Sequence, residues 1–264
     1  MIIFTGGGAI ANEFSKRFDC QIISARRLSD VELTEQFKKA TVIIHNSGLI
    51  QSDNLNELLK CNLELTKRVI DLAYKVNPNC NFINISSMSI LNECDSYLPS
   101  DEMTPYALSK YYSEIYCLNH SFSKLTNVRF STIFYKNKDK DGISRLAYDA
   151  VKYGRIKIYN NGSSCRDVLP VEYVASCLHE LAELDLYPRV LNIASGCSLP
   201  FSFFIEILNE NISELVIENK MLNVHPVLCD YPNHFIFRKN LIDISVIQES
   251  FINYLNMLDE SIGL

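Results

Sequence analysis

The sequence IIFTGGGAIA, at residues 2–11, decides the fold class of this chain. An apolar run typical of a buried strand leads directly into three glycines, and a helical pattern follows at residues 12–18. Gly6, Gly8 and Ala11 match the pattern G-x-G-x-x-A, in which small residues let a pyrophosphate approach the free N–H groups of a helix start. A merely flexible turn is the alternative. The stretch predicts a dinucleotide-binding turn whose candidate cofactor-binding residues are Gly6, Gly8, Ile10 and Ala11.

Apolar, β-branched runs alternate with helix-length segments through most of the sequence. We expect strands at residues 2–5, 20–24, 41–45, 81–86, 127–134 and 190–193. We expect long helices at residues 54–75 and 105–118, and further helices near residues 142–153 and 201–210. This alternation predicts an α/β fold, a Rossmann-type doubly wound parallel sheet, with a small C-terminal region from about Asp141.

Composition limits the classes of partner. The chain has 264 residues, of which 47% are hydrophobic, so it is long enough for one large domain or for a domain with a small lobe. The formal net charge of −6 argues against nucleic acid or an anionic membrane as the main partner. No apolar run approaches the ~20 residues of a membrane span, and no signal-peptide pattern is present at the N-terminus. We expect a soluble cytoplasmic protein.

Cysteines and histidines do not indicate a metal centre. The nine cysteines include no Cys-x-x-Cys pair and read as reduced residues. The five histidines are not spaced as metal ligands, and His45, at the end of an apolar strand, reads as a packed or cofactor-flanking residue. We therefore expect no metal.

The stretch TPYALSK, at residues 104–110, carries the candidate catalytic groups. Tyr106 and Lys110 are four residues apart on an expected helix and so share one face. A nearby ammonium group is expected to lower the pKa of the phenol. Alone, this spacing also fits two side chains on a solvated helix. Ser86 and Ser87 end an expected strand, where the glycine turn and the Tyr106 helix should also meet; an ordinary strand-end cap is the other interpretation of Ser87.

In this order, these pieces resemble the extended short-chain dehydrogenase/reductase family, specifically its NAD(P)-dependent sugar-nucleotide epimerase/dehydratase branch. The resemblance runs from Met1 to about Phe204, and it is carried by residues 5–11, 44–48, 62, 85–89, 106 with 110, 166–175 and 191–196. It implies an NAD(P)-binding Rossmann domain at residues 1–140. It also implies a smaller substrate-binding region at residues 141–264, interleaved with the last strands.

The resemblance also assigns roles. It implies a catalytic triad of Ser87, Tyr106 and Lys110, in which Ser87 contacts the substrate while Tyr106 and Lys110 contact the cofactor. Counting back from Ile90 favours Ser87 over Ser86. Asn46 and Asn62 become candidate cofactor-binding residues; a helix-surface asparagine is the alternative for Asn62. Arg166 becomes a candidate ligand of the substrate diphosphate, with a structural pairing to Asp167 as the competing interpretation.

Three departures from the family pattern are visible. The glycine spacing is one residue shorter than usual, and Ala11 replaces the last glycine. The expected Arg-Pro-x-Asn pattern is Arg-Phe-Ser-Thr at residues 129–132, which puts that substrate contact in doubt. The C-terminal third is short, so we expect a reduced sugar-nucleotide lobe.

The end of the second strand bears on the cofactor. Many dinucleotide-binding proteins carry a carboxylate there, which holds the adenosine ribose of NAD. This chain has Arg26 and Arg27 instead, and guanidinium groups pair with a 2′-phosphate through charge-assisted hydrogen bonds. We predict that NADP(H) is favoured, with Arg26 the more important arginine, and that NAD(H) remains the alternative. Both arginines are solvated loop residues in the competing view.

The residues after Ser87 bear on the reaction. The family's dehydratases carry an Asp-Glu pair there, whereas Met88 and Ser89 of this chain supply no acid or base at neutral pH. We therefore predict NADP(H)-dependent reduction of a nucleoside-diphosphate 4-keto-(6-deoxy) sugar. An NAD-dependent sugar-nucleotide 4-epimerase is the alternative, and a protein that binds a dinucleotide without catalysis is a further one. A homodimer is an expectation from the family.

Overall fold

The computed structural model describes residues 1–92, 95–184, 188–222 and 242–262. The chain folds into two compact units. The first unit comprises Met1–Phe130 and Glu172–Ile193, and the second comprises Ser131–Val171 and Ala194–Leu264. The chain therefore leaves the first unit after Phe130, returns to it at Glu172 and leaves it again after Ile193.

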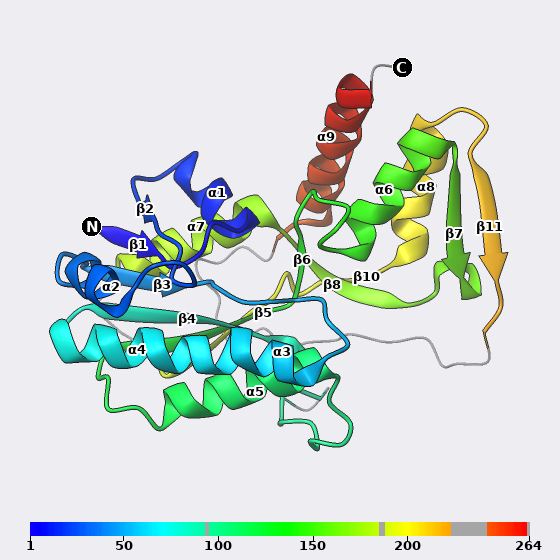
Figure 1. The fold of residues 1–264 in the computed structure, drawn as a ribbon. Coiled ribbons are helices and arrows are strands. Elements are labelled where there is room, and N and C mark those ends of the chain that lie inside the picture. Colours follow the sequence, from blue (N-terminus) through cyan, green and yellow to red (C-terminus); the bar gives the residue numbers. More distant parts are fainter. Residues whose placement is uncertain (93–94, 185–187, 223–241, 263–264) are drawn as a thin grey trace. The chain divides into compact units, whose positions relative to one another are not determined.

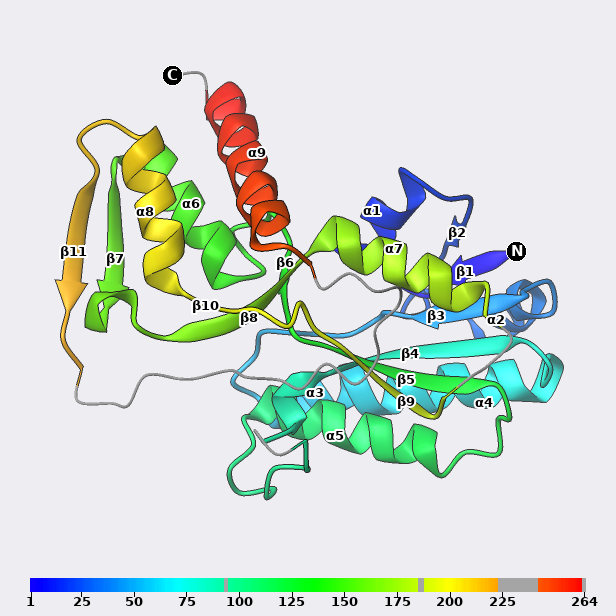
Figure 2. The same ribbon diagram turned by 180° about the vertical axis from the view of Figure 1, so that it is seen from behind.

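The first unit is a parallel sheet with helices on both faces (Figures 1 and 2). Its elements are β1 (Ile2–Phe4), α1 (Ala9–Ser15), β2 (Gln21–Ile22), α2 (Asp30–Phe37), β3 (Val42–His45), α3 (Leu55–Leu58), the π-helical η1 (Leu59–Glu64), α4 (Leu65–Val76), β4 (Asn81–Ser87), η2 (Met88–Ile90), α5 (Pro105–Leu118), β5 (Leu125–Phe130), most of α7 (Val171–Ala182) and β9 (Val190–Ile193). The strand order is β2-β1-β3-β4-β5-β9, and every pairing is parallel. The predicted Rossmann-type fold is confirmed.

Among the described residues, β2 lies at one edge of this sheet. In a doubly wound sheet of order 3-2-1-4-5-6, another strand lies beyond the second. Here residues 38–41 lead from α2 directly into β3, so β2 is the edge strand among the described residues. The turn that follows β2 therefore has no neighbouring strand on its outer side.

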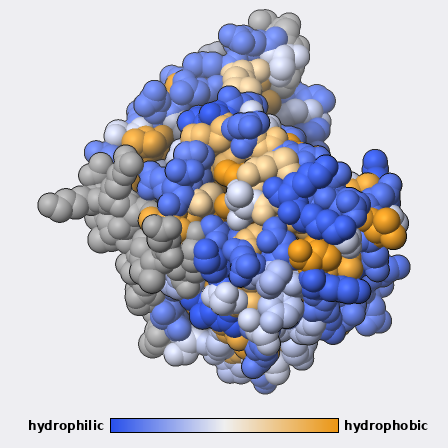
Figure 3. Space-filling model, turned by 90° about the vertical axis from the view of Figure 1, so that its left-hand side faces the viewer, coloured by the Kyte–Doolittle hydropathy of each residue, from blue (hydrophilic) through white to orange (hydrophobic). Residues whose placement is uncertain are grey.

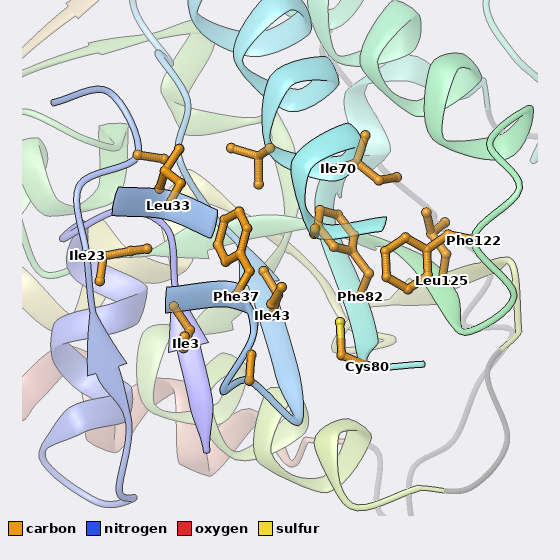
Figure 4. Packing of buried hydrophobic residues seen from close by; sticks show 14 of the residues in the cluster. Ile3, Ile23, Leu33, Phe37, Ile43, Ile70, Cys80, Phe82, Phe122 and Leu125 are labelled. Carbon is orange, nitrogen blue, oxygen red and sulfur yellow. The ribbon is translucent and has the colours of Figure 1, made fainter. Parts of the chain in front are cut away.

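The core of the first unit fills the space between the sheet and helices α2, α4 and α5. Apolar side chains from both layers interlock there, including the rings of Phe82 and Phe122 with centroids 5.6 Å apart (Figure 4). On the opposite face, α1 and α7 cover β1, where Phe4 and Phe14 have ring centroids 4.9 Å apart and His179 stacks on Phe18. Burial of both faces explains the nearly continuous apolar strands.

The second unit has two small sheets and three helices among its described residues. Its elements are β6 (Thr132–Phe134), α6 (Gly142–Tyr153), β7 (Arg155–Tyr159), the 3₁₀ turn η3 (Asn160–Gly162), β8 (Cys165–Pro170), β10 (Ser198–Pro200), α8 (Phe201–Asn211), β11 (Val216–Lys220) and α9 (Ile244–Ile262). Strands pair in the order β10-β8-β6, and β7 pairs with β11 in parallel. Phe134, Phe204 and Phe251 bring β6, α8 and α9 into one aromatic cluster.

The single strand expected at residues 127–134 was wrong, and the error lies at the boundary between the two units. The run at residues 127–134 forms two strands, because Phe130 still pairs with Ile193 whereas Thr132 pairs with Val168. Ser131 lies between them, and its hydroxyl donates to Asp167 (2.5 Å). A continuous apolar run does not reveal that its two halves belong to different sheets.

Helix positions differ from the expectation in smaller ways. The expected helix at residues 12–18 spans Ala9–Ser15. The one expected at 54–75 spans α3 to α4 and contains the π-helical segment η1. The helices α2, α7 and α9 were not predicted.

Among the described residues, no helix combines the length and the apolar character that crossing a bilayer requires. Figure 3 shows hydrophilic residues over most of one face, with hydrophobic patches between them.

Candidate active site

The helix α5 places the two candidate groups of the TPYALSK stretch. Thr104 caps the helix by accepting a hydrogen bond from the Ala107 amide (3.2 Å), and Pro105 occupies the first helical position, where its missing N–H costs nothing. Tyr106 lies in the first turn and is partly exposed, whereas Lys110, one turn later, is 9% exposed. The cap at Thr104 and Pro105 fixes the start of α5, and thereby the positions of Tyr106 and Lys110 on the helix.

Ser87 is the serine that interacts with Tyr106. It is the last residue of β4, and its hydroxyl accepts a hydrogen bond from the Ser89 amide (3.2 Å) and shares another with the Ser89 hydroxyl (2.9 Å). A hydrogen bond from Ser87 to Tyr106 contributes to the pKa of the phenol. Ser86 points to the opposite face of the strand and is buried, with no partner for its hydroxyl among the described residues. This geometry favours Ser87 over Ser86.

The pKa of Tyr106 is raised to about 12, because burial disfavours the phenolate more than the hydrogen bond from Ser87 favours it. We expected Lys110 to lower this pKa, and that prediction is wrong because the pKa is raised. The Lys110 ammonium group donates to the Ile85 carbonyl oxygen of β4. Tyr106 carries its proton at neutral pH, which is the state a proton donor needs.

Burial also lowers the pKa of Lys110, to about 8, while Cys117 and Glu114 oppose the shift. Lys110 remains mostly charged at pH 7 and loses its charge roughly two pH units earlier than a lysine in water. Its ammonium group is thus held between β4 and α5 as a buried cation.

Asn62 is buried, so the helix-surface interpretation is wrong. It lies in η1 and is 1% exposed. Its amide nitrogen donates to the Leu49 carbonyl and to the Ser109 hydroxyl (both 2.9 Å), and its oxygen accepts from the Leu49 amide (2.6 Å). Ser109 in turn donates to the Tyr106 carbonyl (2.7 Å). Asn62 thus ties the segment after β3 to the first turn of α5.

A second buried chain of hydrogen bonds starts at the end of β1. The Thr66 hydroxyl must donate to the Asn62 carbonyl (2.5 Å), because a carbonyl only accepts. His45 Nε2, 2.9 Å from Thr66 Oγ1, is therefore the protonated ring nitrogen, and His45 Nδ1 accepts from the Thr5 hydroxyl (2.8 Å). Burial lowers the pKa of His45 to about 3, so the ring is neutral.

The glycine turn leaves space beside the start of α1. A side chain at Gly6 would meet Ser47 Cα at 3.2 Å, whereas one at Gly8 would meet nothing within 4 Å. No side chain caps α1 at Gly8, so the first N–H groups of that helix keep their hydrogen-bonding capacity. Ile10 and Ala11 are buried and hold α1 against the sheet. Any contact of Ile10 with a cofactor must therefore come from its backbone.

Asn46 lies beside this turn. Its amide nitrogen donates to the Gly6 carbonyl (2.8 Å), while its buried side-chain oxygen has no partner among the described residues. An unsatisfied acceptor beside Gly6 fits a bound polar group, because buried polar atoms are normally paired. The chain's own residues thus fit the predicted dinucleotide.

Arg26 and Arg27 are exposed, and neither side chain has a hydrogen-bond or ion-pair partner among the described residues. The positive charge of Arg26 helps to lower the pKa of His45, which locates Arg26 on the side of the carboxyl end of β3. Arg27 has no such effect. This difference favours Arg26 as the residue closer to the cofactor end of the sheet.

Arg166 belongs to the second unit. It lies in β8 and lines a cavity of about 600 Å³ within that unit. Asp167 is the next residue of the strand and points to the other face, where it accepts hydrogen bonds from Ser131 and from the Ser195 and Gly196 amides. The alternative of a pairing between Arg166 and Asp167 is therefore not supported. The cavity lining is basic and aromatic, with Arg145, Arg155, Lys157, Tyr153, Tyr159 and Phe201, against Asp149.

The described residues contain no cluster of three or more His, Cys, Asp or Glu side chains that could hold a metal ion.

Sequence reasoning missed Thr66 and Ser109 as partners of the site. Their spacing was a signal for a place in the site, since Thr66 follows Asn62 by one helical turn and Ser109 directly precedes Lys110. The local sequence does not identify which polar residues become buried, so this signal was not enough.

Comparisons with known proteins identify the family of the chain and solved structures of the same fold. The NAD dependent epimerase/dehydratase family matches residues 9–194. No curated protein matches the sequence significantly. Solved structures with the same fold include an NAD-dependent NDP-hexosamine 5,6-dehydratase involved in tunicamycin biosynthesis (17% identity, 98% of each chain, TM-score 0.79). They also include RMD from Pseudomonas aeruginosa complexed with NADPH (18%, 98% of this chain and 99% of that chain, 0.79). A third is a UDP-N-acetylglucosamine 4-epimerase from Methanobrevibacter ruminantium (16%, 98% of each chain, 0.76).

At 16–18% identity these structures establish the fold alone. The family match covers most of the chain: it begins at Ala9, directly after the three glycines, and includes the segment with Ser87, Tyr106 and Lys110. The chain belongs to the NAD-dependent epimerase/dehydratase family.

Proposed function

We propose that the protein is an NADP(H)-dependent reductase of a nucleoside-diphosphate 4-keto-(6-deoxy) sugar. The observation that carries the proposal is Tyr106, a partly buried phenol that keeps its proton at neutral pH and is hydrogen-bonded to Ser87. A reductase needs a proton donor at the carbonyl oxygen of its substrate. Met88 and Ser89, the residues after Ser87, provide no acid or base for dehydration.

The bound cofactor would supply the hydride. Tyr106 Oη would give its proton to the alkoxide oxygen that forms, and the Ser87 hydroxyl would donate a hydrogen bond to the same oxygen. The Ser89 hydroxyl, 2.9 Å from that of Ser87, provides a further hydrogen-bonding group behind it. Lys110, one helical turn after Tyr106, would hold the nicotinamide ribose.

The cofactor preference rests on Arg26 and Arg27, which are exposed and have no ion-pair partner among the described residues. A 2′-phosphate satisfies free guanidinium groups, whereas a ribose hydroxyl does not neutralise their charge. Asn46, Gly6 and Gly8 would hold the pyrophosphate region. NADP(H) is therefore the preferred cofactor in this proposal.

The substrate would use the cavity in the second unit. Its volume of about 600 Å³ lies in the range of small-molecule pockets, and Arg145, Arg155, Lys157 and Arg166 outnumber the single acid, Asp149. Positive groups suit a diphosphate, and Tyr153, Tyr159 and Phe201 offer apolar surface to a base or sugar.

The test is absorbance at 340 nm with NADPH and a panel of nucleoside-diphosphate 4-keto-6-deoxy sugars, with NADH in parallel. Stoichiometric loss of NADPH with one substrate supports the reductase and identifies its sugar. No loss with any substrate, together with tightly bound NAD released on denaturation, would support the 4-epimerase instead. Neither turnover nor bound NAD would favour a protein that binds a dinucleotide without catalysis.

A further inference from the structure

The turn at residues 24–30, which carries Arg26 and Arg27, is held by its own backbone. The Ala25 amide donates to the Thr5 carbonyl (3.0 Å), and the amides of Arg27 and Leu28 both donate to the Ser24 carbonyl (3.0 and 3.1 Å). Ser29 then begins α2 with a capping box to Glu32. The turn is ordered by these bonds, yet its two arginine side chains remain exposed and unpaired among the described residues.

Arg68 of α4 completes this arrangement from outside the turn. Its Nη1 donates to the Ala25 carbonyl, its Nη2 to the Leu28 carbonyl, and its Nε to the Asp30 carboxylate, each at 2.7 Å. The two carbonyls lie on either side of the Arg26–Arg27 pair. A planar guanidinium fork makes these three bonds at once, and a lysine does not.

The position of β2 at the sheet edge explains why such a brace is needed. No strand supports the outer side of the turn among the described residues. The helix α4 packs against α2 on the same face, and Arg68 reaches from it to the turn. A single side chain thus links the long central helix to the segment that would read the adenosine ribose.

Arg68 also changes the charge of the turn. Asp30 lies three residues after Arg27, and its carboxylate would repel a phosphate. Its ion pair with Arg68 offsets that charge (2.7 Å), although the Asp30 side chain is 64% exposed and the effect is therefore small. Holding the two carbonyls is the larger effect expected of Arg68.

We propose that Arg68 is a positioning residue that sets the preference for a cofactor with a 2′-phosphate by fixing the backbone on both sides of Arg26 and Arg27. This inference rests on the proposed NADP(H) preference. In an unbraced turn, the two guanidinium groups must be ordered when the phosphate binds, and that ordering reduces affinity. A cofactor without the 2′-phosphate does not use these groups and loses little.

The experiment measures dissociation constants of NADPH and NADH by titration calorimetry for the wild-type protein and for Arg68→Met and Arg68→Lys. We expect Arg68→Met to raise the dissociation constant of NADPH about tenfold and that of NADH no more than about twofold. Arg68→Lys keeps the charge but not the fork and should behave nearly as Arg68→Met does, so it keeps the test valid if Arg68→Met folds poorly. Lys67→Gln, which removes a charge from the preceding residue of the same helix, should change neither constant.

Two further variants, Arg26→Ala and Arg68→Met combined with Asp30→Asn, show which part of the proposal is wrong if the expected result is not found. Arg26→Ala should also weaken NADPH selectively. If the wild-type protein binds both cofactors equally and Arg26→Ala has no effect, the proposed cofactor preference fails and the role of Arg68 fails with it. If Arg26→Ala removes the preference but both Arg68 variants leave it intact, or weaken both cofactors equally, only the role of Arg68 is overturned. If adding Asp30→Asn to Arg68→Met restores NADPH binding, Arg68 acts by neutralising the charge of Asp30 and not by positioning the turn. That result would overturn the proposal.

Discussion

At the scale of single residues, Tyr106 holds its proton more tightly than a phenol in water does. Its pKa is raised to about 12 by burial, against a hydrogen bond from Ser87. The sequence predicted that Tyr106 and Lys110 lie on one face of a helix, because i and i+4 share a helix face, and both residues lie on α5. It did not predict the sign of the pKa shift, because burial depends on what the rest of the chain packs around the phenol.

Replacing Tyr106 by phenylalanine tests its role as the proton donor. The ring and its packing remain, but the transferable proton is lost, so we expect turnover to fall by roughly 10²- to 10⁴-fold while the dissociation constant of NADPH stays within about twofold. Steady-state rates and a fluorescence titration measure the two quantities. Tyr112→Phe, an exposed tyrosine on the same helix, is the matched control. Unchanged turnover in the Tyr106 variant would exclude the proposed acid.

His45 is a second residue whose state follows from its partners. The Thr66 hydroxyl donates to a carbonyl, so His45 carries its proton on Nε2, and its pKa is lowered to about 3. The folded protein then binds fewer protons than the unfolded chain between about pH 3 and 6.5. This group therefore stabilises the fold fully above about pH 6.5, and its contribution is lost as the pH falls toward 3.

Nitrogen-15 NMR of the histidine ring checks this prediction directly. We expect a neutral Nε2–H tautomer whose shifts do not change between about pH 5 and 8, whereas exposed histidines of ordinary pKa titrate near 6.5. Thr66→Val should disturb the tautomer without exposing the ring. A midpoint for His45 near pH 6.5, or a proton on Nδ1, would contradict the hydrogen-bond assignment.

At the scale of elements, α5 is fixed to β5 by a buried ion pair. Arg129 of β5 donates through Nε to both carboxylate oxygens of Glu114 (3.0 and 3.1 Å), and the two side chains are 7% and 0% exposed. The Tyr97 hydroxyl donates to the same carboxylate (2.8 Å) and accepts from Arg129 (2.9 Å). The sequence only placed Arg129 in a doubtful substrate-binding pattern, whereas the structure buries it against Glu114 of α5.

Breaking this pair at one side should destabilise the protein strongly. Arg129→Met leaves Glu114 buried without its cation, and we expect the free energy of unfolding to fall by roughly 3–5 kcal/mol. Adding Glu114→Gln removes the stranded charge and keeps an acceptor for Tyr97, so most of that loss should be recovered. Urea denaturation at pH 7 measures both variants. A loss below about 1 kcal/mol in the single variant would mean that Glu114 finds another partner or solvent.

Predictability differed among elements for physical reasons. The bounds of α5 and α6 were predicted correctly because local signals mark them, namely Thr-Pro before Tyr106 and Asp141 before Gly142. The split of residues 127–134 between two sheets was missed, because strand pairing depends on partners far away in the sequence. The contacts of Arg68 were missed for the same reason, since its partners lie about 40 residues earlier.

At the scale of the whole molecule, the candidate groups are distributed between the two units. The glycine turn, Arg26, Ser87, Tyr106 and Lys110 belong to the first unit, and Arg166 with its cavity belongs to the second. The alternation of strands and helices predicted the sheet of the first unit because its faces are buried and each βαβ step is local. The second unit had no such repeating pattern, and its strands β7, β8, β10 and β11 were not predicted.

This division predicts that the two ligands protect different parts of the chain from hydrogen exchange. NADPH alone should slow exchange at residues 5–11 and 24–30, because its phosphates order the turns of the first unit. A nucleoside diphosphate alone should slow exchange at residues 145–166, around the basic cavity of the second unit. Mass spectrometry of peptides from the full-length protein resolves the two patterns. Arg166→Ala should abolish protection by the nucleoside diphosphate and leave that by NADPH unchanged, whereas protection of residues 24–30 by the nucleoside diphosphate, with none at 145–166, would show that the cavity is not its site.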